Sequence, residues 1–224
     1  MSTQVDGQKS RSVATQSALM EAAEKLVARK GLENVSIKEI VKEAGQKNES
    51  ALQYHFKSFQ GLINAIVDKR SLETQMLRAE LLEKLYASQE QTTLRDACRM
   101  MVMPSFLLAR RSAGYRRYIL SFSQNLALRN NTLAFVNRHG AGGESGRETS
   151  ELLRQHLPHL DAGTFEARLE AAIRLVSISM GHHAREKNAF RGDQSDWFIS
   201  NLLDAMVGLL SAPISDETKA LAKK

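Results

Sequence analysis

Apolar residues along this chain recur at helical rather than strand spacing. Those of the first stretch lie at positions i, i+3, i+4, i+7 and i+8 and are Leu19, Ala22, Ala23, Leu26 and Val27. Arg29 and Lys30 follow, and Gly31 ends the pattern as expected at a helix C-terminus. No run alternates apolar and polar residues as a half-buried strand does. The sequence therefore predicts an all-α protein of roughly eight to ten helices.

A long helix is predicted from Phe59 to about Tyr86, with Leu72 and Met76 on its apolar stripe. The next helix begins at Leu94, and Pro104 should kink it because proline lacks the N–H that a helix uses. Later helices are expected over residues 115–126, up to Pro158, from Asp161 or Gly163 to about 180, and over 195–210.

Two short helices are predicted between Gly31 and Phe59. Ser36 and Glu39 form a capping box at the start of the first, and Gly45 ends it after about two turns. The second starts with Asn48 as its N-cap, and Leu52 and Phe56 anchor it inward at i, i+4. A short helix, a glycine turn and another short helix are typical of a helix-turn-helix.

The outer face of the second short helix has side chains suited to reading DNA. Gln53 is able to pair with adenine, Glu49 to accept from cytosine, and Ser50 to bond a base or a phosphate. Tyr54, His55 and Lys57 lie toward the end of the helix, where phosphates are contacted. The alternative is a three-helix subdomain with an ordinary solvated face, and periodicity alone leaves both interpretations open.

Composition and charge narrow the class of protein. The net charge is +6, and half of this excess falls within residues 1–70, which permits nucleic-acid binding without establishing it. A single cysteine, Cys98, excludes an internal disulfide and a cysteine-based zinc site and indicates a cytoplasmic location. The longest apolar stretch, 101–109, is too short to span a membrane, and no signal peptide is expected.

Residues 13–67 resemble the N-terminal DNA-binding domain of the TetR family of bacterial transcriptional regulators. The stretches that carry the resemblance are 22–26, 31–40, 43–45 and 54–58, together with Leu62. Two features depart from the family pattern. The turn 45–50 is one residue longer than the common form, and Phe59 stands where the family often has lysine.

The resemblance implies a domain organisation. It assigns the helix-turn-helix domain to 13–70 and a larger helical ligand-binding and dimerisation domain to 71–215. The polar composition of residues 1–12 predicts a disordered arm, and residues 216–224 are expected to be a polar tail. The residues that we expect to contact DNA are Ser36, Lys47, Asn48, Glu49, Ser50, Gln53, Tyr54, His55 and Lys57.

Methionine and aromatic residues are concentrated in the middle helices. Such side chains often fill a core, but adaptable methionines near the Pro104 kink also suit an apolar cavity. The residues expected to line an effector pocket are Met101, Phe106, Tyr115, Tyr118 and Phe122. We expect a small apolar or amphipathic effector.

The last two long helices are apolar on more than one face, which favours a homodimer joined through a four-helix interface. The residues expected in that interface are Ile173, Ser177, Gly181, Ala184, Leu203 and Leu210. The alternative is that both helices are fully buried within a monomer.

No pattern indicates catalysis, a metal or a cofactor. The glycine-rich segment 139–146 lacks the features of a phosphate loop and is predicted to be a flexible loop. Pro158 separates His156 from His159, and the adjacent His182 and His183 point about 100° apart on a helix. We therefore expect ordinary hydrogen-bonded or solvated histidines and a protein that is not an enzyme.

The sequence thus predicts a ligand-responsive repressor that is released from a double-stranded DNA operator by its effector. A constitutive regulator without an effector is the alternative, and a tightly filled 75–135 region would favour it. A metabolite-binding or enzymatic helical bundle is a third interpretation, which requires no DNA binding at low salt.

Overall fold

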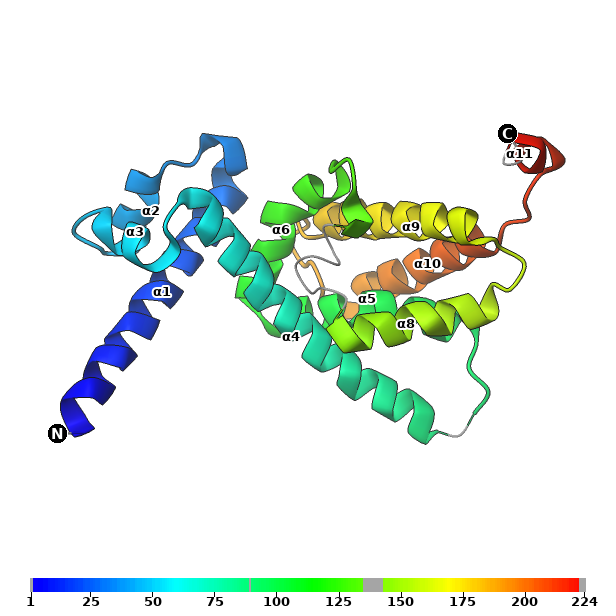
Figure 1. Ribbon diagram of the computed structural model, residues 1–224, viewed down its shortest axis with the longest axis horizontal. Helices are drawn as coiled ribbons and strands as arrows, with labels where there is room; N and C mark the ends of the chain where they lie inside the picture. Colours follow the sequence, from blue (N-terminus) through cyan, green and yellow to red (C-terminus); the bar gives the residue numbers. More distant parts are fainter. Residues whose placement is uncertain (1, 89, 135–142, 222–224) are drawn as a thin grey trace.

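The computed structural model describes residues 2–88, 90–134 and 143–221, and every regular element in these ranges is a helix (Figure 1). The all-α prediction is confirmed. The elements are α1 (Ser2–Lys30), the short 3-10 helix η1 (Leu32–Asn34), α2 (Ile37–Glu43), α3 (Ser50–Phe56), α4 (Phe59–Ala87), α5 (Leu94–Arg111), α6 (Ala113–Ala127), α8 (Gly143–His156), α9 (Ala162–His183), α10 (Gly192–Ser211) and α11 (Asp216–Leu221).

Two hydrophobic cores organise the chain. The smaller one joins α1, α2, α3 and the start of α4 with Phe122 of α6, and its other members include Leu19, Ile40, Leu52 and Leu62. The larger one lies among the end of α4 and helices α5, α6, α8, α9 and α10. Because α4 contributes to both cores, a domain boundary at 70/71 falls inside a continuous helix rather than in a linker (Figure 1).

The first short helix is capped as predicted. The Ser36 hydroxyl accepts the Glu39 N–H at 3.3 Å, and the Ser36 N–H donates to the Glu39 carboxylate at 3.0 Å. Hydrogen bonds from Lys30 and from Ser36 lower the pKa of Glu39 to about 2. This network ties the end of α1 to the start of α2.

The predicted cap of α3 is wrong. The N-cap residue is Glu49, and the Asn48 carboxamide instead accepts from the Ser50 hydroxyl. Glu49 has helical angles, φ −71° and ψ −14°, so the extended backbone that a side-chain cap requires is absent there.

Helices also occupy parts of two segments that were expected to be irregular, and a further helix lies in the predicted polar tail. α1 begins at Ser2 rather than after a disordered arm at 1–12, and extending a helix already anchored by its buried half costs little. α8 begins at Gly143, inside the predicted glycine-rich loop, and residues 139–142 lie outside the described residues. The expected polar tail contains the exposed helix α11.

Pro104 lies inside α5, which continues to Arg111. Proline has no N–H, so the carbonyl of Met100, four residues earlier, loses its helical donor. The buried side chain of Arg78 on α4 supplies a replacement, with Nε donating to that carbonyl at 3.2 Å. The helix therefore tolerates the proline because a neighbouring helix satisfies the exposed backbone oxygen.

No helix among the described residues is long and apolar enough to cross a membrane.

Candidate DNA-binding surface and effector cavity

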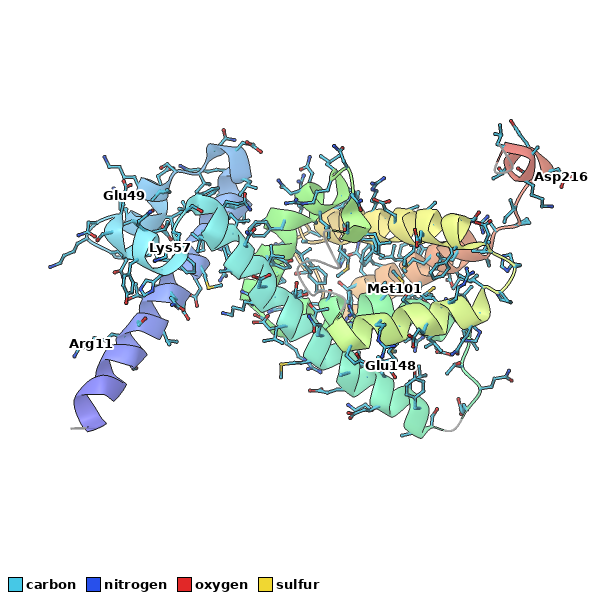
Figure 2. All side chains as sticks on the ribbon, in the orientation of Figure 1. Arg11, Glu49, Lys57, Met101, Glu148 and Asp216 are labelled. Carbon is cyan, nitrogen blue, oxygen red and sulfur yellow. The ribbon has the colours of Figure 1, made fainter. Side chains whose placement is uncertain are left out.

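Helix α3 presents a polar surface away from the small core, around the labelled Glu49 and Lys57 (Figure 2). Leu52 holds the helix from its buried side, and Phe56 packs against the same core. Eight of the nine residues expected to contact DNA are exposed, namely Ser36, Lys47, Asn48, Glu49, Ser50, Gln53, Tyr54 and Lys57. The surface can approach a groove without any core residue having to move.

Lys57 ends α3 in the left-handed region, with φ 66°. Its Nζ donates to the Tyr54 carbonyl at 3.2 Å and lies 5.9 Å from the centre of the Tyr54 ring. The ammonium group therefore sits at the C-terminal end of α3, where it is available to an approaching phosphate.

His55 differs from the other eight. Its side chain is half-buried, and its Nδ1 lies 3.2 Å from the Gln16 carboxamide nitrogen of α1. This contact joins α3 to α1, so His55 positions the helix instead of offering a solvent-facing group to a phosphate.

Sequence reasoning missed the close approach of α3 and α4. The Ser58 hydroxyl caps α4 by accepting the Gly61 N–H at 3.0 Å. A Cβ on Gly61 would overlap the carbonyl oxygen of Phe56. The absence of a side chain at Gly61 thus sets how tightly the two helices meet.

A buried ion pair joins α1 to α4. Arg70 donates from Nε and Nη2 to the two oxygens of Glu24, at 2.8 and 2.9 Å, and from Nη1 to Glu73 at 2.8 Å. The Ser121 hydroxyl of α6 donates to the Glu24 carbonyl at 3.1 Å. Three helices that connect the two cores therefore meet at Glu24.

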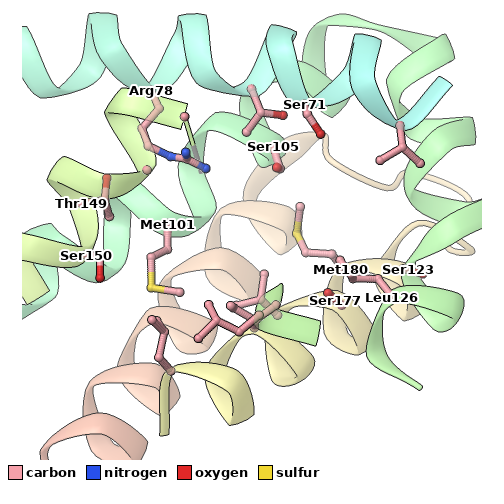
Figure 3. Close-up of a pocket in the computed structure, with 18 of the residues that line it drawn as sticks. Ser71, Arg78, Met101, Ser105, Ser123, Leu126, Thr149, Ser150, Ser177 and Met180 are labelled. Atoms are coloured by element: carbon pink, nitrogen blue, oxygen red, sulfur yellow. The ribbon is translucent and has the colours of Figure 1, made fainter. Parts of the chain in front are cut away.

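A cavity of about 810 Å³ lies among α4, α5, α6, α8 and α9 (Figure 3), and Leu32, Ile63 and Val67 from the N-terminal part of the chain also line it. Met101, Tyr115, Tyr118 and Phe122 line it, as expected from the sequence. Phe106 does not: it is fully buried in the core, with its ring 5.6 Å from that of Phe190. Its side chain packs against Phe190, in the connection between α9 and α10, rather than against the cavity.

The cavity has chemically different walls. The α4 side is polar and includes Ser71, Thr74 and Arg78, which sequence reasoning missed. The Thr74 hydroxyl lies 2.6 Å from the Tyr115 hydroxyl, which in turn donates to Ser105 at 3.2 Å. The α9 side is mostly apolar, with Phe165, Leu169, Ile173, Val176 and Met180, although Glu166 and Ser177 also belong to it.

The residues expected at a dimer interface lie inside the chain. Leu203 and Leu210 are buried in the larger core, and Ile173 and Ser177 line the cavity. Gly181 faces α6, where a Cβ would overlap Ser123, and Ala184 is half-buried against the core. These small and apolar residues serve the packing of α9 on α6 and α10, which helical periodicity alone does not distinguish from packing on a second chain.

His183 closes the turn between α9 and α10. Its Nε2 accepts the Phe190 N–H at 3.1 Å, and its Nδ1 lies 3.0 Å from the Glu186 carboxylate. Phe190 has φ 64°, an unfavourable backbone that this hydrogen bond holds. No group of three or more metal-ligating side chains occurs within the described ranges.

We expect stability to fall in mild acid because of His183. Burial lowers the pKa of His183, despite the opposing effect of Glu186. As the pH falls below about 6.5 the unfolded chain takes up this proton before the folded one. The stability that the neutral His183 side chain contributes is therefore fully present above about pH 6.5 and is lost as the pH falls below it.

Urea unfolding at pH 7.5 and 5.5 measures this loss. His183→Phe should reduce the difference between the two pH values, whereas His182→Phe, at the exposed neighbour, should not. If the stability difference between the two pH values is the same in both variants, His183 is not the group that causes the loss.

The comparisons with known proteins agree with this arrangement. Residues 19–66 match the family model described as bacterial regulatory proteins, tetR family. The chain is similar in structure to Salmonella enterica GusR, with TM-score 0.52 and 19% identity over 88% of this chain and 95% of GusR.

Two further solved structures are similar over most of their length. RolR in complex with resorcinol has TM-score 0.46 and 14% identity, over 93% of this chain and 98% of RolR. SCO7518 from Streptomyces coelicolor A3(2) has TM-score 0.43 and 18% identity, over 89% and 99%. No curated protein sequence matches the chain.

Proposed function

Since residues 19–66 make this chain a member of the TetR family of DNA-binding bacterial regulators, we propose that it is a repressor released from its operator by a small apolar or amphipathic effector. One observation carries the proposal. Phe122 lines the cavity and also belongs to the hydrophobic core of the helix-turn-helix domain. A ligand in the cavity therefore contacts a side chain on which the DNA-binding domain packs.

The neighbouring residues extend this connection. Tyr118 lines the cavity and packs against both cores, and its ring is 5.4 Å from that of Phe122. The Arg70 guanidinium lies 5.8 Å from the centre of the Tyr115 ring and binds Glu24 of α1. A ligand that moves α6 thus moves α1 with it.

Such a movement would lower operator affinity in a dimer. Two recognition helices must reach half-sites about 34–36 Å apart, so a shift of a few ångströms misaligns one of them. The effect is a coupling free energy between the cavity and the DNA surface. The cavity volume also favours this function over a constitutive regulator, for which a filled interior was expected.

Two substitutions on the DNA-binding surface should have different effects. Gln53→Ala should cost about 1–3 kcal/mol on the operator and relax base preference at one position, because Gln53 is assigned to a base. Lys57→Ala should weaken binding to all sequences similarly and reduce the salt slope by about one, because Lys57 is assigned to a phosphate.

Operator fragments selected from random DNA provide the substrate, and fluorescence anisotropy at several salt concentrations provides the measurement. Lys69→Ala is the matched control, since Lys69 is exposed on α4 outside the α3 surface. If the Gln53 and Lys57 variants lose affinity for operator and for random DNA in the same way, the assignment of Gln53 to a base and Lys57 to a phosphate is wrong. Absence of binding to duplex DNA at low salt would contradict the proposal that the protein is a DNA-binding regulator.

The proposed functional unit is a homodimer acting in the cytoplasm, where bacterial DNA lies. We place the dimer interface on the outer faces of α9 and α10, because the apolar side chains of Ile178 and Trp197 are 48% and 68% exposed there. Both helices lie side by side at one end of the molecule (Figure 1). An isologous contact through these faces would bury both side chains and form a four-helix interface.

A further inference from the structure

One wall of the cavity is polar although it is buried. Ser71, Thr74 and Arg78 lie at i, i+3 and i+7 on α4, so all three point to the same side of the helix. Their exposed fractions are 4%, 7% and 8%. Polar groups in such positions cost free energy unless they are hydrogen-bonded, which sets this wall apart from an ordinary apolar core.

Arg78 brings a positive charge to that wall. Its side chain extends from α4 toward Met101 (Figure 3). The bond from Nε to the Met100 carbonyl fixes the plane of the guanidinium, which is the planar fork that matches a carboxylate in a bidentate manner. Burial lowers the pKa of Arg78, and a ligand carboxylate beside the guanidinium would favour the charged form.

Positively charged residues outnumber negatively charged ones around the cavity. Among the described lining residues are the arginines Arg78, Arg129, Arg147 and Arg154 and the glutamates Glu151 and Glu166. Arg147 is exposed and already paired with Glu144 and Glu151 at the rim. The buried Arg78 is therefore the cation best placed to select a ligand by charge, because solvent screens the exposed ones.

We propose that the effector is an amphipathic carboxylate whose carboxylate group binds Arg78 and whose hydrocarbon body lies against the apolar wall of α9. The inference rests on the proposed effector-dependent function and narrows it to a chemical class. A volume of about 810 Å³ suits a ligand of drug-like size. The polar residues of α4 lie in one part of the lining and the apolar residues of α9 in another, which suits a molecule with one polar end.

Matched pairs of carboxylate and alcohol test this class on the full chain. We would titrate octanoate against octanol, 4-phenylbutyrate against 4-phenylbutanol, and 2-naphthoate against 2-naphthalenemethanol, by calorimetry and by release of operator DNA. At least one carboxylate is expected to bind tenfold or more tightly than its alcohol. Arg78→Met should bring that ratio close to one, and Arg78→Lys should retain part of it.

The ratio of carboxylate to alcohol affinity separates ligand recognition by Arg78 from its structural role, which is to bond the Met100 carbonyl of α5. If Arg78 only supports the helix, Arg78→Met will weaken both members of a pair equally, and the inference is overturned. Arg147→Met, at the exposed rim, is the control and should leave the ratio unchanged. If Arg78→Met fails to fold, the wild-type ratio and Arg78→Lys still decide the question.

The remaining outcomes distinguish this inference from the proposed function. Binding and operator release by alcohols, with equal or weaker effects of the carboxylates, would overturn the carboxylate class and leave an effector-responsive repressor. Failure of every compound to bind a protein that still holds its operator would count against both.

Discussion

Glu24→Gln is expected to lower the free energy of unfolding by about 3 kcal/mol. The substitution keeps the shape of the side chain but removes the charge that faces Arg70, and both partners are buried. Burial opposes the charge on Arg70, yet its hydrogen bonds to Glu24 and Glu73 outweigh burial and raise its pKa in the wild-type protein. In the variant the guanidinium stays charged because arginine is not deprotonated in proteins. An uncompensated buried charge is the main source of the loss.

The matched control is Glu73→Gln, which removes the more exposed carboxylate on the same guanidinium. Its cost should stay within about 1 kcal/mol, because solvent replaces much of that interaction. The double variant Glu24→Gln/Arg70→Met should recover much of the stability by removing both buried charges. Urea denaturation of the four proteins measures the series. Equal losses for the two single glutamine variants would contradict the structural account.

Local signals in the sequence were sufficient for the first part of the fold. The capping box at Ser36 and the glycine at position 45 act within a few residues, so their consequences for α2 could be predicted. The exposed face of α3 followed from the anchors Leu52 and Phe56. His55 could not be assigned in this way, because its partner Gln16 is 39 residues away in the sequence.

The middle of α4 shows why the cavity wall could not be predicted. Leu72 and Met76 were expected to face inward, but they are 57% and 60% exposed. Ser71, Thr74 and Arg78 face inward instead. Hydrophobic periodicity assumes that the buried side of a helix is the apolar one, and a polar wall that faces a cavity reverses that rule.

The second large effect is expected from Trp197→Glu, which should convert the proposed dimer to a monomer. A carboxylate on the outer face of α10 would be buried without a partner in an isologous contact, twice per dimer. Operator affinity should fall by about 100-fold or more, because a single recognition helix then holds one half-site alone. Sedimentation velocity and anisotropy on the selected operator measure the two effects.

Trp197 is the only tryptophan in the sequence, so its fluorescence reports the interface directly. In the wild-type protein its emission should shift to longer wavelength on dilution, as the indole passes from a buried contact to water. The control Met76→Glu changes a comparably exposed apolar side chain on α4 and should leave the sedimentation coefficient unchanged. Dissociation by Met76→Glu with an intact dimer in Trp197→Glu would move the interface to α4. It would leave the outer faces of α9 and α10 without the role proposed for them.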